Sequence, residues 1–133
     1  MRKSQPVRCP VAKLAAEYGE LTRRHEALDR IIYKSQTIEL AKQNRAKLEQ
    51  DHLNDRRSAI REAASFMVPS SAEGAAFLVI QSFNLSGDET DEHGHRTLAR
   101  YHYALLRYFV ASGTNVAPEV LNYDMPQYMD PLQ

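Results

Sequence analysis

The chain has 133 residues, enough for one domain with a core of its own. Its 17 basic and 17 acidic residues cancel overall, yet the first 65 residues hold 14 of the bases with nine acids, and the remaining residues hold three bases with eight acids. A single cysteine excludes an intramolecular disulfide, and no apolar run approaches the length of a membrane span. We therefore expect one domain over residues 1–133, in the cytoplasm and without membrane contact.

Glycine and proline are few, which leaves long stretches without a helix breaker and favours an all-α fold. Pro10 suits the first turn of a helix, and Pro69 separates two helical patterns. The sequence therefore predicts a small helical bundle. Its expected segments are a flexible basic arm (1–9), an antiparallel coiled-coil-like helical hairpin (10–68), a buried helix followed by an amphipathic helix (70–113), and an irregular tail packed on the bundle (114–133).

With His25 included, the residues of one mainly apolar face recur at alternating spacings of four and three through the first predicted helix, from Pro10 to Tyr33. This spacing is typical of the contact stripe of a coiled coil. We expect the stripe to mediate self-association, so that the protein forms a homo-oligomer. Its members, called the first-helix stripe below, are Leu14, Tyr18, Leu21, Leu28 and Ile32.

The stripe loses its register after Tyr33, and a second helical pattern follows, with Thr37 as a candidate N-cap. We interpret the change as a tight turn near Ser35. Because no glycine or proline lies there, one continuous helix over residues 10–67 is the alternative. A second helix of 30 residues would be about 45 Å long, so part of it would protrude from the bundle or pair with another copy.

A helix apolar on nearly every side is predicted between Pro69 and Leu85. Ser70 and Glu73 have the spacing of a capping box at its start, and Gly74 permits a close approach by a neighbouring segment. Because a helix that is apolar all round is usually buried, we expect it to form the centre of the core.

The last predicted helix runs from about Asp91 to Ser112, with Gly113 as the residue that ends it. We expect its buried face to comprise Leu98, His102, Leu105 and Phe109. Three basic residues follow one another along another face at helical spacing. This arginine stripe, Arg96, Arg100 and Arg107, is expected to meet an anionic partner or the acidic tail at Asp124 and Asp130.

Two Glu-x-x-His motifs, Glu49–His52 and Glu92–His95, suggest a di-iron site of the kind found in carboxylate bundles. Glu17 or Glu20, with Glu73, could complete the set, but Glu73 would lie about 20 Å from Glu92 if the last two helices are antiparallel, which argues against such a site. A simpler metal hypothesis is a local zinc-type site in residues 88–95. Its carboxylates have an alternative role, because acids also stabilise the N-terminus of a helix. Its candidate ligands are Asp88, Asp91, His93 and His95.

The basic first half also raises the possibility of nucleic-acid binding, with the N-terminal arm and Arg56-Arg57 as the place of contact. Acidic residues are interleaved throughout this half, however, and phosphate binding needs basic charge gathered on one face. A solvated helix surface with ion pairs is therefore the favoured interpretation.

The step Pro69-Ser70-Ser71-Ala72-Glu73-Gly74 and the later Tyr128-Met129-Asp130-Pro131 resemble motifs in a loose group of small helical bacterial proteins, some of them phage-associated. The resemblance implies a helical bacterial protein and assigns no function. No nucleophile motif or phosphate-binding loop is present, and we expect neither catalysis nor a cofactor. The favoured hypothesis is a self-associating interaction or adaptor protein. The alternatives are a nucleic-acid or anion binder and a metal protein at residues 88–95.

Overall fold

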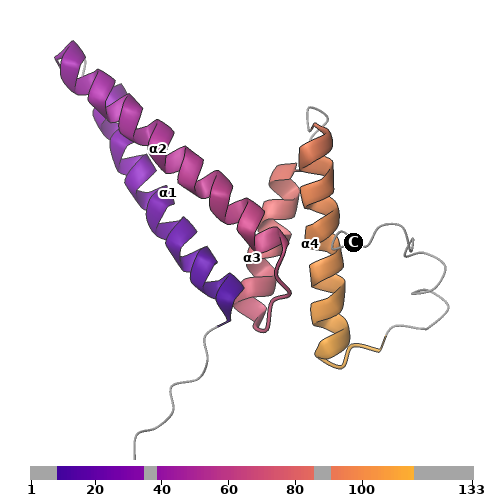
Figure 1. Cartoon of the computed structure of the whole chain (residues 1–133). Helices are drawn as coiled ribbons and strands as arrows, with labels where there is room; N and C mark the ends of the chain where they lie inside the picture. The colour runs from indigo at the N-terminus through magenta and orange to yellow at the C-terminus, as the bar shows by residue number, and fades with distance from the viewer. Residues whose placement is uncertain (1–8, 35–38, 86–90, 116–133) are drawn as a thin grey trace, which may run out of the picture.

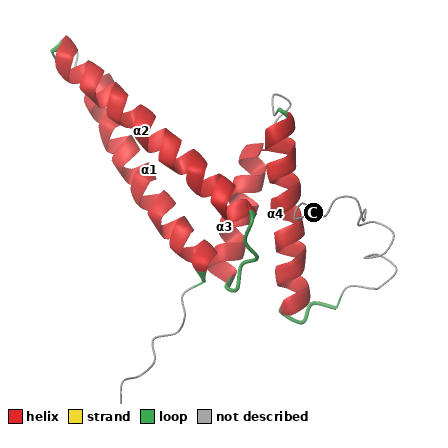
Figure 2. Cartoon of the chain, in the orientation of Figure 1, coloured by secondary structure: helices red, strands yellow, loops and turns green. Residues whose placement is uncertain are grey.

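The computed structural model describes residues 9–34, 39–85 and 91–115, and within them it contains four helices and no strand (Figure 2). The helices pack as a small bundle, which confirms the predicted all-α class. None of these described helices combines the length and apolar composition that crossing a membrane requires. Their bounds are α1 Pro10–Lys34, α2 Leu40–Ser65, α3 Ala72–Leu85 and α4 Glu92–Ala111.

The first two helices form the predicted antiparallel hairpin and not one continuous helix (Figure 1). Gln50 on α2 joins them, because its Nε2 donates to Asp29 Oδ1 at 2.6 Å and to the His25 carbonyl at 3.3 Å. The helix α2 begins after Glu39, so the N-cap predicted at Thr37 is not the one observed. The expected turn near Ser35 lies outside the described residues.

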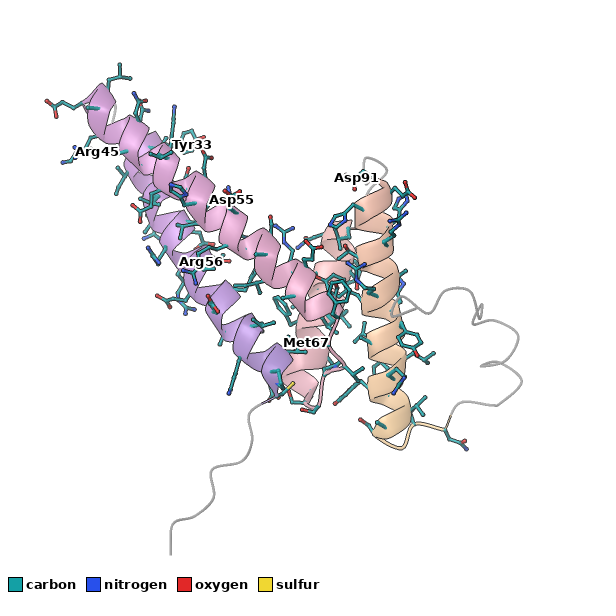
Figure 3. The ribbon with its side chains drawn as sticks, in the orientation of Figure 1. Tyr33, Arg45, Asp55, Arg56, Met67 and Asp91 are labelled. Carbon is teal, nitrogen blue, oxygen red and sulfur yellow. The ribbon has the colours of Figure 1, made fainter. Side chains whose placement is uncertain are left out.

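The second pair of helices packs near one end of this hairpin (Figure 1). The helix α3 lies against α1, where the rings of Tyr18 and Phe77 meet edge to face at 5.4 Å between centroids. The helix α4 lies beside α3 and against the last turns of α2. The other end of the hairpin, marked by Tyr33 and Arg45 in Figure 3, therefore projects beyond the second pair, as the length of α2 led us to expect.

Short-range signals set the ends of α3 and α4. Ser71, and not the predicted Ser70, caps α3, since its Oγ accepts a hydrogen bond from the Gly74 N–H at 3.2 Å. Asp91 caps α4 through a 2.8 Å bond from the Gly94 N–H. At the other end of α4, Gly113 has a φ of 84°. The amides of residues 113 and 114 bond back to the carbonyls of residues 110 and 109, which is the pattern of a Schellman motif.

The expectation that α3 is buried on every side is wrong. Phe77 and Leu78 are in the core, but Val79 is 39% exposed and Ile80 is 58% exposed. The helix touches α1 on one side and α4 on another, with only a slight contact with α2. Two neighbouring helices cannot cover the whole circumference of a third, so one apolar face of α3 stays at the surface.

The starts of α1 and α3 meet at Gly74, which is buried. A Cβ atom built on this residue would lie 2.9 Å from Cys9 Sγ and 3.2 Å from the Cβ atoms of Val11 and Pro69. These distances are shorter than ordinary van der Waals contact. The predicted close approach at Gly74 is therefore present, and only a residue without a side chain allows it.

We predict that Gly74→Ala lowers the free energy of unfolding by roughly 1–3 kcal/mol, because the added methyl group forces α1 and α3 apart. Gly19→Ala is the matched control, since its nearest atom, Arg23 Nη1, is 3.8 Å away. The control should gain up to about 1 kcal/mol from helix propensity. Urea denaturation monitored by circular dichroism measures both, and an equal gain in the two variants would contradict the close packing.

Candidate functional site

An apolar groove lies between α3 and α4, which run side by side in antiparallel directions (Figures 1 and 2). It encloses about 320 Å³ and opens to the surface. The exposed face of α3 forms one wall, and α4 forms the other. The residues that line this α3–α4 groove are Val79, Ser82, Phe83, His102 and Leu105.

The buried face of α4 agrees only in part with the predicted one: Leu105 is in the core and Leu98 is partly buried, but His102 and Phe109 are not. Tyr101 and Ala104 are buried, whereas His102 is exposed and Phe109 is 45% exposed. A contact with the end of α2 determines which side of α4 is buried. The Tyr101 hydroxyl donates a hydrogen bond to the Arg61 carbonyl and thereby keeps the Tyr101 side of α4 in the interior. Residues predicted for the core thus form a wall of the groove and a surface beside it.

A second apolar area, called here the α4 outer face, continues from the groove toward the end of α4. Phe109 follows Leu105 by one helical turn, and Val110, 47% exposed, lies next to it. Arg107 flanks this area, where its Nη1 donates to the Tyr103 hydroxyl at 3.1 Å. We define the α4 outer face by Tyr103, Leu106, Arg107, Phe109 and Val110.

The arginine stripe does not form one continuous surface. Arg100 is buried, where its Nε donates to Ser65 Oγ at 2.8 Å and its guanidinium carbon lies 4.2 Å from the centroid of the Phe66 ring. Arg96 is exposed and pairs with Glu92 at 2.7 Å. Of the three, only Arg107 is exposed without a carboxylate partner among the described residues.

The first-helix stripe packs inside the chain's own bundle. Leu21 and Ile32 are buried, and the other three members are partly buried against the core. The stripe contacts α2 and α3 of the same chain, so these side chains already have neighbours without a second copy. The positions that the stripe occupies are Leu14, Tyr18, Leu21, Leu28 and Ile32.

Among the described residues, no group of three histidine, cysteine or acidic side chains is placed to hold a metal ion. Asp91 is engaged as the cap of α4 (Figure 3), and the exposed His93 lies 3.6 Å from Glu62. His95 is also exposed, and Asp88 lies outside the described residues. The structure therefore brings His93 close to an acid of α2, Glu62.

Ion pairs occupy several of the bases in the first half of the chain. Arg56 pairs with Glu17 at 2.6 Å and thereby links α2 to α1. Arg23 pairs with Glu20 along α1, and Arg24 reaches Glu49 on α2. The N-terminal arm lies outside the described residues. Nucleic-acid binding needs positive charge gathered on one face. Within the hairpin, acids lie between the bases and pair with several of them, so the positive charge is not gathered in this way.

The Cys9 thiol lies where the first turns of α1 and α3 meet. Its Sγ accepts a hydrogen bond from the Ser70 amide at 3.3 Å. Burial raises the pKa of the thiol, but hydrogen bonds from the Ser71 side chain and from the amides of Ser70 and Ala12 outweigh it and lower the pKa to about 6. The side chain is only 5% exposed, so the thiolate contributes to the packing of these helix ends and offers little access to a reagent.

No protein-family model, curated protein or solved structure matches the chain. The α3–α4 groove is therefore interpreted from its own geometry. Sequence reasoning missed the exposure of its α3 members Val79 and Phe83, because periodicity alone does not tell how many neighbours a helix has. A signal for this exposure was present: α3 is apolar around its whole circumference, and the described residues form only three other helices that could cover it.

We predict that Tyr101→Phe lowers the free energy of unfolding by about 1–2 kcal/mol, because it removes the hydrogen bond that the buried Tyr101 hydroxyl donates to the Arg61 carbonyl. Tyr33→Phe is the control, since the Tyr33 side chain is 78% exposed. Chemical denaturation of both variants measures the difference. A Tyr101→Phe variant as stable as the control would show that the bond between α4 and α2 adds nothing.

We also predict that the Cys9 thiolate stabilises the fold at alkaline pH. Its folded pKa of about 6 lies below the ordinary value of 9.0, so this stabilisation is complete above 9.0 and is lost as the pH falls through 6. The stability gap between the native chain and Cys9→Ser should therefore widen with rising pH. Ser71→Ala should raise the pKa measured by thiolate absorbance, and a gap independent of pH would contradict the assignment.

Proposed function

We propose that the protein is a non-enzymatic helical interaction protein that docks onto another protein through the exposed apolar face of α3 and the α3–α4 groove. A second copy of the chain is the proposed partner. The observation that carries the proposal is the exposure of Val79 and Ile80 beside an apolar groove. Contiguous apolar surface of this kind marks contact sites in soluble proteins.

Several features support self-association through this face. An apolar face can meet the same face of another copy around a two-fold axis, which is the commonest arrangement of homodimers. Charged side chains are few along α3, where Glu73 is the only one, so no like charges oppose such a contact. The first-helix stripe is occupied within the chain, which moves the proposed contact from α1 to α3.

The proposal is tested by sedimentation velocity of the full chain over a range of concentrations. We expect a concentration-dependent oligomer that Ile80→Glu converts to a monomer, because the change places a charge in the apolar contact. Leu48→Glu on α2 is the matched control, since Leu48 and Ile80 are both 58% exposed. It should leave the oligomer intact. A strict monomer at every concentration, or equal effects of the two variants, would refute self-association through α3.

A further inference from the structure

We infer that residues 116–133, the C-terminal segment, dock on the α4 outer face of the same chain. This segment lies outside the described residues, and the inference rests on the surface that it would cover. Phe109 and Val110 are about half exposed there, and Leu106 is partly exposed. The surface differs from the α3 face proposed for self-association, so the two proposals stand or fall separately.

The last described residues lie at the last turn of α4, close to this surface. Gly113 has a positive φ, and the Thr114 amide bonds to the Phe109 carbonyl at 3.0 Å. The Schellman motif ends the helix there, and its two bonds hold Gly113 and Thr114 against the last turn of α4, the turn that carries Phe109 and Val110. Any segment that follows Asn115 therefore starts next to the exposed apolar side chains.

The segment is long enough to cover the face. The helix α4 has 20 residues and is about 30 Å long. The 18 residues of the C-terminal segment span up to about 60 Å when extended, so they can return along α4 with length to spare. The segment follows directly after the end of α4, so it is always close to the α4 outer face. This high effective concentration favours docking within one chain over docking between copies.

The chemistry of the segment complements that of α4. From His93 to Ala111, α4 carries three arginines and no acid, and Arg107 is exposed without a carboxylate partner among the described residues. The segment has no basic residue. Apolar side chains lie between its acids, which fits a surface of apolar residues flanked by an arginine. Its acids are Glu119, Asp124 and Asp130, and its large apolar residues are Val116, Val120, Leu121, Tyr123, Met125, Tyr128, Met129 and Leu132.

The chain contains no tryptophan, so one introduced indole reports on the segment alone. In the full chain, Tyr123→Trp should give a blue-shifted emission that acrylamide quenches slowly, because docking removes the indole from water. Adding Phe109→Glu should shift the emission to the red and speed the quenching. The reference for an exposed indole is Tyr33→Trp, whose site is 78% exposed at the far end of the hairpin.

Further variants separate docking from other causes. Arg107→Glu should weaken the blue shift and Arg107→Lys should keep it, since the ion pair needs a positive charge. Ile80→Glu should leave the emission unchanged, and circular dichroism verifies that each variant keeps its helices. The inference is overturned if the Tyr123→Trp emission equals that of Tyr33→Trp or is unaffected by Phe109→Glu. A blue shift that grows with protein concentration overturns docking within one chain and assigns the segment to a neighbouring copy.

Discussion

The arrangement of the four helices depends on the contact between the starts of α1 and α3 at Gly74. A side chain at that position would meet Cys9, Val11 and Pro69, so the two helices approach this closely only because a glycine is present. The contact fixes α3 to one end of the hairpin. Since α4 follows α3 in the antiparallel direction, it can reach α2 only at the last turns of that helix. The far half of the hairpin and the outer sides of α3 and α4 are left uncovered as a result.

Polar side chains then decide which face of α4 turns inward. Arg100 enters the interior because Ser65 accepts its hydrogen bond and the Phe66 ring lies against its guanidinium group. A buried guanidinium group is costly unless it is bonded, so these partners fix both the rotation and the axial position of α4. The Tyr101 hydroxyl adds a second bond to α2. Apolar residues on the opposite side, Phe109 and Val110, are consequently at the surface.

The sequence predicted both ends of α4 well because their causes are local. Asp91 and Gly113 act through bonds within one turn of the helix, whereas α2 begins after Glu39 and ends at Ser65, away from the predicted Thr37 and before Pro69. The one-residue error between Ser70 and Ser71 is of the size expected for such signals. The groove was not predictable in the same way. Its existence depends on α4 being anchored through Arg100, a residue that the charge pattern placed on an exposed stripe, and on bonds between residues 35 positions apart in the chain.

The structure shows which of the unevenly distributed charges are paired and which are not. Several bases of the first half are matched by acids within the hairpin, as in the pairs of Arg56 with Glu17 and of Arg24 with Glu49, so that half presents alternating charges. In the second half, the acid Glu92 pairs with Arg96 near the start of α4, and Arg107 lacks such a partner among the described residues. The acids beyond Asn115 are the nearest in sequence that can supply one. An electrostatic contact that is weak at an exposed site gains strength when apolar contacts beside it exclude water, and Val110, three residues after Arg107 on the same side of α4, is the exposed apolar side chain that would supply such a contact.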